Sequence, residues 1–426
     1  MNCGRISKLK TILAIFIVLQ LSLTMLPIAA EYEIYPQLIP QVQRPGLAPI
    51  QLDLSDLQLA SPNIIIREFF ADGTYTDYHR ELASDPVYPA SMTKMMSTLV
   101  ILRGLREKGI PLQEVVEVQQ SDVQGLAAAG ASIMGLLIGE LIPIREALYG
   151  VLLPSGSDSL RLLHRLVHQD ETSFVADMNK TAQALGMKGT HFANSTGLFD
   201  PYNYTTPEDL TLLLHCLLQD PLFREICSTR SYTTPPTNLH GEGIYLEHTI
   251  QYYGDKLNID NASITGGKTG WLPEAGYCFT SFRTFGDRLV IVSTERAREA
   301  GQQIEDHAKI YRFLEEHLPP LPEDVSVPNE SERWQTALSP KEAGLDDGTP
   351  LKPPQPELHG AAKKLELKIL ETMDAKGANE YISRIKRTKN LRFVYYSLPV
   401  LGLIVLISSL HHYREKRRRY KRPKRL

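Results

Sequence analysis

The spacing of apolar and polar residues changes along the chain and predicts an order of structural elements. A β-branched run at 63–66, followed by a turn at 71–74 and a second extended segment, predicts a β-hairpin. The apolar run 95–102 predicts a helix. After this helix the pattern stays largely helical for more than a hundred residues.

Three further helices are predicted in this stretch. The first covers 136–153 and has Pro143 near its start, and the second covers 170–185 and stops at Gly186. The third opens with Thr206 as N-cap and Pro207 as the first helical residue.

From about residue 230 the pattern favours strands. Residues 277–282 alternate between apolar and polar, 288–293 form an apolar run, and 304–317 have helical spacing. A hairpin, a helical insertion, antiparallel strands and a final helix together predict an α+β fold.

Both ends of the chain have the composition of membrane-targeting segments. Basic residues before an apolar run, then small residues, predict a signal peptide; an uncleaved anchor is the alternative. The apolar stretch 393–410 is about 27 Å long as a helix and so barely spans a bilayer, with an amphipathic surface helix as the alternative. The predicted segments are a signal (1–30), a lead-in (31–60), a catalytic domain (61–318), a Pro-rich linker (319–358), a helical stalk (359–392), a transmembrane helix (393–410) and a basic cytoplasmic tail (411–426).

Charge and cysteine content narrow the functional class. The formal net charge is −3, but 414–425 alone carry nine Lys/Arg and one Glu, so the remainder is strongly acidic. An acidic body argues against nucleic-acid binding, and the basic tail places the body outside the cytoplasm. Without Cys3 of the predicted signal, the odd set Cys216, Cys227 and Cys278 supports neither a disulfide framework nor a zinc site. No metal or cofactor is expected.

Ser91 and Lys94 are the first candidates for chemistry. They lie three residues apart at the head of the helix predicted over 95–102, and thus on one face of it. A lysine whose pKa is lowered by burial can take the proton of a serine hydroxyl. The same spacing also occurs at Ser7/Lys10 and at Ser383/Lys386, so it needs support from the rest of the chain.

Two later motifs give that support. Ser155 lies in a hydroxyl-rich turn 64 residues after Ser91, and Lys268-Thr269-Gly270 follows 113 residues after Ser155. Ser-x-x-Lys, a second serine motif and Lys-Thr-Gly in this order are typical of penicillin-binding proteins and class A β-lactamases.

The chain resembles the low-molecular-mass penicillin-binding proteins, the serine D-alanyl-D-alanine carboxypeptidases of bacterial envelopes. The similarity covers roughly 60–300 and includes the phrases at 89–94, 148–156, 185–192 and 268–278. It implies a transpeptidase-like α+β fold, with an antiparallel sheet flanked by helices and an all-helical subdomain. It also implies removal of the terminal D-alanine from peptidoglycan pentapeptides, with β-lactams as inhibitors.

The resemblance also assigns roles to individual residues. Ser91 is the nucleophile, Lys94 the base and Ser155 the proton relay to the departing D-alanine. Lys268 and Thr269 hold the substrate carboxylate, and Lys268 helps to lower the pKa of Lys94. The backbone N–H groups of Ser91 and Trp271 form the oxyanion hole.

The sequence departs from the family pattern at three points. Ser157 stands where the family has asparagine, so it is a candidate substrate contact or, alternatively, a cap for the helix that follows. Leu272 replaces a common threonine, and the β-rich domain that many relatives carry after the catalytic unit is replaced by the Pro-rich segment.

Two other functions remain open. A β-lactamase needs a base that activates water for deacylation, and no residue at a recognisable spacing supplies one. A wall-binding paralogue that has lost activity through Ser157 is the other alternative.

Overall fold

The computed structural model of the chain describes residues 41–44, 47 and 49–320. All of them belong to the first of two compact units, 1–348 and 349–426. The predicted signal, stalk, membrane helix and tail, and nearly all of the predicted linker, lie outside the described residues. Within the part that is described, no helix has the length and apolar character needed to cross a bilayer.

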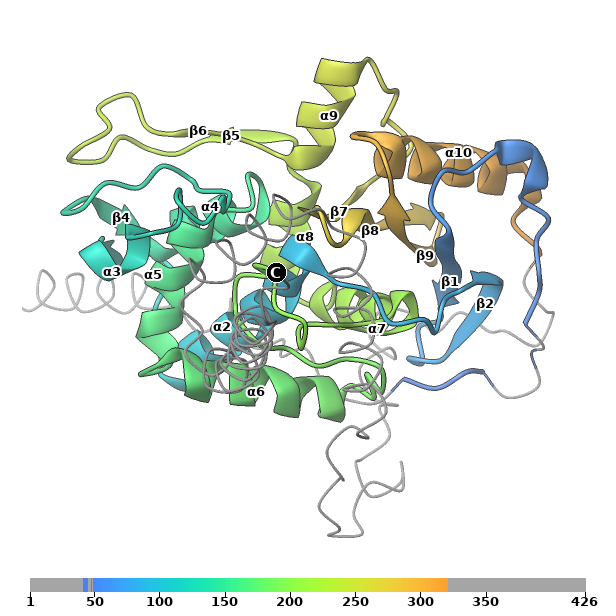
Figure 1. Cartoon of the computed structure of the whole chain (residues 1–426), viewed down its shortest axis with the longest axis horizontal. Helices are drawn as coiled ribbons and strands as arrows, with labels where there is room; N and C mark the ends of the chain where they lie inside the picture. The colour runs from blue at the N-terminus through green and yellow to red at the C-terminus, as the bar shows by residue number, and fades with distance from the viewer. Residues whose placement is uncertain (1–40, 45–46, 48, 321–426) are drawn as a thin grey trace, which may run out of the picture. The chain divides into compact units, whose positions relative to one another are not determined.

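A five-stranded antiparallel sheet forms the centre of the described unit, with the strand order β2-β1-β9-β8-β7 (Figure 1). The predicted hairpin is confirmed as β1 and β2, and the predicted late strands pair as neighbours, β8 with β9. The sheet strands are β1 (Asn63–Phe69), β2 (Tyr75–Glu81), β7 (Gly266–Leu272), β8 (Gly276–Phe285) and β9 (Arg288–Ala297).

Helices cover both faces of this sheet. Helix α10 packs on β8 and β9 on one face, whereas α7 packs on β9, β1 and β8 on the other. The helices are α2 (Thr93–Glu107), α3 (Gln120–Val123), α4 (Ile144–Leu152), α5 (Ser157–Val167), α6 (Glu171–Ala184), α7 (Pro207–Leu217), α8 (Pro221–Ser228), α9 (Thr249–Leu257) and α10 (Gln302–His317), with short 3₁₀ turns η2 (Ser55–Leu57) and η3 (Ala90–Met92). The α+β prediction is confirmed.

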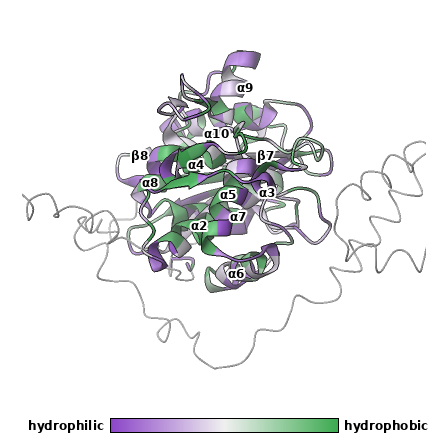
Figure 2. Cartoon of the chain, turned by 90° about the vertical axis from the view of Figure 1, so that its left-hand side faces the viewer, coloured by the Kyte–Doolittle hydropathy of each residue, from purple (hydrophilic) through white to green (hydrophobic). Residues whose placement is uncertain are grey.

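Two apolar clusters fill the spaces on either side of the sheet. One lies between the sheet and α10 and includes Ile66, Val292 and Tyr311. The other, larger cluster surrounds α2, whose residues are buried almost throughout. Figure 2 shows α2 and α4 largely green and α9 largely hydrophilic. The turn that carries Ser91 therefore leads into a helix whose first ten residues, 93–102, are all buried.

The N-cap prediction for Thr206 is confirmed, whereas the helix predicted over 136–153 is wrong in its first part. Thr206 accepts a hydrogen bond from the Asp209 backbone, with Pro207 as the first helical residue. The 136–153 helix starts only at Ile144, because residues 141–143 form a strand and the backbone N–H groups of Leu136 and Leu137 bond to the side chains of Asp158 and Glu140. Four short strands make two further two-stranded sheets: β3 (Val115–Glu117) with β4 (Leu141–Pro143), and β5 (Ser231–Thr233) with β6 (Tyr245–Glu247).

Candidate active site

Ser91 lies in η3, immediately before the first turn of α2, and Lys94 lies within that turn. The 3₁₀ turn runs directly into the helix, so the three-residue spacing brings the two side chains together. The Lys94 Nζ lies 2.9 Å from the Ser91 Oγ in a hydrogen bond, and a second bond of 2.9 Å joins Nζ to the Thr196 carbonyl oxygen. Nucleophile and base are thus held on one rigid element.

The second and third motifs meet each other across the sheet edge. Ser155 follows α4 in a left-handed conformation, with φ +65°, and its Oγ accepts a 2.9 Å hydrogen bond from the Lys268 Nζ. Lys268 lies on β7 and also donates to the Thr269 carbonyl oxygen at 2.9 Å. Strand β7 pairs only with β8 within the described sheet, so its other edge is left facing η3.

Two glycines let the walls of the site close on the turn that carries Ser91. A Cβ on Gly197, which has φ +79°, would lie 1.9 Å from the Ala90 carbonyl oxygen. A Cβ on Gly270 of β7 would lie 2.6 Å from the Pro89 carbonyl oxygen. The 196–198 segment and β7 therefore press on the turn through backbone contacts that a side chain would prevent.

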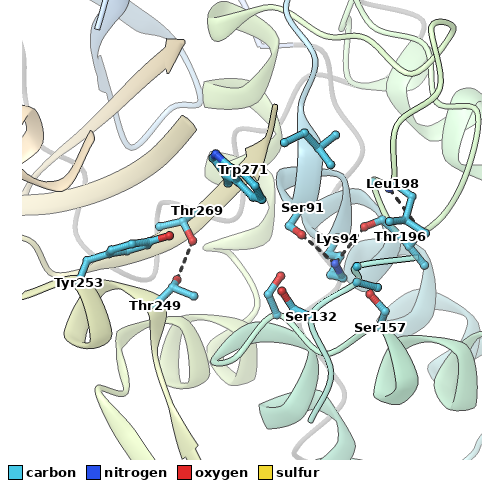
Figure 3. Close-up of a pocket in the computed structure, with 16 residues that line it drawn as sticks. Ser91, Lys94, Ser132, Ser157, Thr196, Leu198, Thr249, Tyr253, Thr269 and Trp271 are labelled. Atoms are coloured by element: carbon cyan, nitrogen blue, oxygen red, sulfur yellow. Dashed lines mark hydrogen bonds between the residues drawn. The ribbon is translucent and has the colours of Figure 1, made fainter. Parts of the chain in front are cut away.

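These elements enclose a cavity of about 140 Å³ that contains the three motifs (Figure 3). Its lining includes every residue predicted from sequence except Lys268, which lies buried behind Ser155 and Thr269. The lining residues are Ser91, Lys94, Gly130, Ala131, Ser132, Ser155, Ser157, Thr196, Gly197, Leu198, Thr249, Tyr253, Thr269, Gly270, Trp271 and Leu272.

Burial governs the electrostatics of both lysines. It lowers the pKa of Lys94 to about 7, against a smaller opposing effect of the Asp158 carboxylate. Burial also lowers the pKa of Lys268 well below its usual value, and repulsion from Lys94 lowers it further. Desolvation, rather than the repulsion by Lys268 inferred from sequence, is thus the main cause for Lys94. A lysine with a pKa of about 7 is neutral in about half of the molecules at pH 7, so it is fit to act as a base.

His248 supports the Lys268 strand without adding charge. It is fully buried at the start of α9, where its Nδ1 accepts from the Ile250 N–H and its Nε2 lies 3.2 Å from the Gly267 carbonyl oxygen. Burial and the nearby Lys268 lower its pKa to about 3, so the ring is neutral and its Nε2–H donates to Gly267. The ring joins α9 to β7 beside the site.

Ser157 does not cap the helix that follows. Helix α5 begins at Ser157 itself and Gly156 holds the N-cap position, so the capping hypothesis is wrong. The buried Ser157 Oγ lines the cavity and forms no hydrogen bond with a protein group. Its hydroxyl is therefore available to a molecule bound in the cavity.

Thr269 and Trp271 lie two residues apart on β7, so they project from the same face of the strand. The Thr269 Oγ1 donates a 2.7 Å hydrogen bond to the Thr249 Oγ1 of α9. The Trp271 side chain is 49% exposed, although the strand before it is buried. The cavity thus has a side formed by hydroxyls and an aromatic ring, opposite the side that holds Lys94 (Figure 3).

The arrangement can perform nucleophilic chemistry. It supplies a serine, a lysine with a lowered pKa in hydrogen-bond contact with it, and a second buried lysine beside a second serine. Across the part of the chain that the structure describes, no group of three His, Cys, Asp or Glu residues has the geometry of a metal site. Cys216, Cys227 and Cys278 are buried free thiols.

Comparison with known proteins identifies the family. The family model described as D-alanyl-D-alanine carboxypeptidase matches residues 79–295, which is just over half of the chain. The chain belongs to the D-alanyl-D-alanine carboxypeptidase family of peptidases. Among curated members, it is 28% identical to the enzyme of Streptomyces sp. (strain K15) over 248 residues, covering 57% of this chain and 84% of that protein.

Other relatives agree with this assignment. The D-alanyl-D-alanine carboxypeptidase DacF of Bacillus subtilis is 29% identical over 224 residues, which are 51% of this chain but only 54% of that protein. The crystal structure of the Streptomyces K15 DD-transpeptidase matches 60% of this chain and 98% of its own, with 28% identity and a TM-score of 0.53. Penicillin-binding protein 6B of Escherichia coli shares the fold, at 22% identity over 64% of this chain and 81% of its own, with a TM-score of 0.54.

Within this carboxypeptidase fold, several residues that line or support the cavity lie outside the motifs predicted from the sequence. Thr196 and Ser132 come from loops, and Thr249 and Tyr253 come from α9, an element that the sequence pattern did not predict. Asp158 does not line the cavity but supports one of its walls. In the sequence, its position directly after Ser157 was the one indication that Asp158 lies near the site.

Asp158 holds the loop that forms this wall. Its carboxylate accepts hydrogen bonds from the backbone N–H groups of Met134 and Gly135 at 2.8 Å and of Leu136 at 3.0 Å. The loop in turn presents Ser132 to the cavity, and the Ser132 carbonyl oxygen accepts from the Ser157 N–H at 2.8 Å. One buried carboxylate therefore fixes the position of the wall opposite β7.

We predict that Asp158→Ala loosens this wall in the carboxypeptidase. Hydrogen bonds to a charged group contribute about 1.5–3 kcal/mol each, so amide exchange at 134–136 should accelerate by about tenfold or more. Hydrogen–deuterium exchange with mass spectrometry measures the change. Asp260→Ala, which removes an exposed ion pair with Arg312, is the control and should leave the 134–136 peptides unchanged. Unchanged exchange at 134–136 in Asp158→Ala would contradict the assignment.

Proposed function

We propose that this protein removes the terminal D-alanine from peptidoglycan pentapeptides through an acyl-enzyme on Ser91. The observation that carries the proposal is the 2.9 Å contact between the Ser91 Oγ and a buried lysine whose pKa is lowered to about 7. Family membership supplies the substrate class, and β-lactams resemble that substrate and so act as inhibitors.

In the acylation step, Lys94 takes the Ser91 proton as the Oγ attacks the carbonyl carbon between the two D-alanines. The new C–O bond forms a tetrahedral intermediate whose oxyanion is stabilised by the backbone N–H groups of Ser91 and Trp271. The C–N bond then breaks, and the departing amine takes the proton that Lys94 had accepted, relayed through Ser155, which is hydrogen-bonded to Lys268. Water then attacks the ester carbonyl carbon, the bond to the Ser91 Oγ breaks, and a proton of the water passes to that Oγ while the peptide leaves as a carboxylate.

The substrate's free carboxylate explains why the enzyme acts at a chain end. The hydroxyls of Thr269 and Thr249 line one side of the cavity, and Lys268 lies buried behind Thr269. A carboxylate placed there accepts hydrogen bonds from the hydroxyls, and its negative charge favours the protonated form of Lys268. Peptides without a terminal carboxylate lack this interaction.

The residues that line the cavity predict that a penicillin adduct on Ser91 is hydrolysed slowly. Among the residues that line the cavity there is no Asp or Glu to activate water against the acyl-enzyme. This composition favours a penicillin-sensitive carboxypeptidase over a β-lactamase.

The direct test uses the purified protein with a fluorescent penicillin and a pentapeptide. Wild type should be labelled on Ser91, as mass spectrometry of the adduct shows, and should release D-alanine; Ser91→Ala should do neither. Ser383→Ala, at a chance Ser-x-x-Lys match, is the control and should be labelled like wild type. Equal labelling of Ser91→Ala would disprove the proposal. Muropeptide binding without D-alanine release would instead support the inactive wall-binding paralogue.

The rate of acylation should rise with pH through about 7. Lys94 accepts the Ser91 proton only when its amine is neutral, and with its pKa lowered to about 7 it is protonated below that pH. The second-order rate constant for penicillin should therefore increase about tenfold per pH unit below 7 and level off above it. Stopped-flow measurement of labelling between pH 5 and 9 tests this expectation. A rate constant that does not change between pH 5 and 7 would exclude Lys94 as the base.

We also propose that the protein is an envelope enzyme anchored by residues 393–410, with its catalytic domain outside the cytoplasm and its basic tail inside. The apolar stretch and the basic run 414–425 support this orientation. Protease added to intact spheroplasts should then digest the catalytic domain and spare a C-terminal epitope tag. Protection of the domain, or its release by high salt alone, would refute the anchored topology.

A further inference from the structure

Three aromatic rings from three elements lie together on one side of the cavity. The Tyr277 ring of β8 lies 5.8 Å from the Trp271 ring of β7 and 6.2 Å from the Tyr253 ring of α9, measured between centroids. Trp271 and Tyr253 line the cavity, whereas Tyr277 packs against both without lining it. Tyr277 therefore braces two rings that face the reaction site.

Trp271 and Tyr253 lie on the side of the cavity where the departing D-alanine would bind. In Figure 3, Trp271 and Tyr253 lie on the same side as Thr269 and Thr249, away from Lys94. Under the proposed function, on which this inference rests, these hydroxyls hold the carboxylate of the departing D-alanine. The two rings therefore border the space into which the side chain of that residue, and any chain extending from it, would project.

The small volume of the cavity means that Trp271 and Tyr253 limit the size of the leaving group. Its volume of about 140 Å³ is close to that of an engineered cavity of about 150 Å³ that binds benzene, a molecule with as many non-hydrogen atoms as alanine. This volume is that of the whole cavity, which also holds the acyl part of the substrate, so the leaving-group side has room for a small residue and little more. A larger terminal residue, or the amine of a second peptide attacking the acyl-enzyme, has to displace a ring that Tyr277 holds in place.

We propose that Trp271 and Tyr253 are specificity-determining residues that limit the leaving-group side to a small D-residue. Acylation still forms the Ser91 ester as the C–N bond breaks and the amine takes a proton. In acylation, the rings limit the size of the amine that can leave. In the next step they limit the size of the nucleophile that can reach the ester, so water enters freely and a bulky amine does not. The side chains thereby favour hydrolysis at a terminal D-alanine over exchange with another peptide.

The test compares leaving groups within one variant. Wild type, Trp271→Ala, Tyr253→Ala and Trp271→Phe are each given two tripeptides that end in D-Ala-D-Ala or D-Ala-D-Phe. The readout is the ratio of kcat/KM for D-phenylalanine release to that for D-alanine release, which is independent of the fraction of active enzyme. Trp271→Ala keeps the backbone N–H of the oxyanion hole, so the side chain alone is tested.

We expect each alanine variant to raise this ratio about tenfold or more, the usual discrimination of a pocket against extra apolar bulk, and Trp271→Phe to stay near wild type. The ratio of aminolysis to hydrolysis with D-phenylalanine as added acceptor should rise in parallel. Tyr245→Ala, which changes a tyrosine 63% exposed on β6 and outside the cavity, is the matched control and should keep the wild-type ratio.

The outcomes separate this inference from the function on which it rests. Active alanine variants that keep the wild-type ratio overturn the inference alone. A wild type that releases no D-alanine and is not labelled by penicillin overturns the proposed function and the inference with it. If Trp271→Ala does not fold, Tyr253→Ala decides.

Discussion

Removal of two lysine amines from water is the constraint on which the site depends. An ammonium group buried without an ionic partner is costly, and the protein meets this cost by lowering the proton affinity of both amines. Among the described residues, Lys94 and Lys268 form their hydrogen bonds with hydroxyl and carbonyl oxygens and not with carboxylates. A carboxylate in direct contact would stabilise the charged form and so weaken Lys94 as a base.

Three elements pack around η3, the turn that carries Ser91, and exclude water from the two lysine amines. Helix α2 is buried over its first ten residues, 93–102, β7 packs on η3 at Gly270, and the 196–198 segment closes the other side at Gly197. The carboxylate that acts against the fall in the pKa of Lys94, Asp158, accepts hydrogen bonds from backbone N–H groups of the cavity wall. The negative charge of Asp158 partly opposes the lowering of the Lys94 pKa, although Asp158 forms no hydrogen bond with Lys94. Structural support and electrostatic adjustment thus come from one side chain.

Sequence reasoning located the motif residues, because their chemistry is tied to local spacing and chain order. Ser91, Lys94, Ser155 and Lys268 were named correctly as a group that meets in space. Thr196, which contributes a carbonyl oxygen, and Tyr253, on a helix without a clear pattern, were not found, because tertiary packing alone brings them to the cavity. The prediction of a helix over the first part of 136–153 was wrong because of tertiary contacts as well. Distant side chains there satisfy the backbone donors that a helix would have used.

Ser157 is the point at which the site departs from the family motif. Its Oγ lines the cavity and has no hydrogen-bond partner in the protein, so it can bond to a bound group. Asparagine would reach further into the cavity and contact Lys94 as well, whereas the shorter serine leaves Lys94 bonded to Ser91 and the Thr196 carbonyl oxygen. The base is therefore oriented by backbone rather than by the second motif. Since the backbone of Thr196 is fixed by Gly197 packing on Ala90, the orientation of Lys94 does not require an asparagine at position 157.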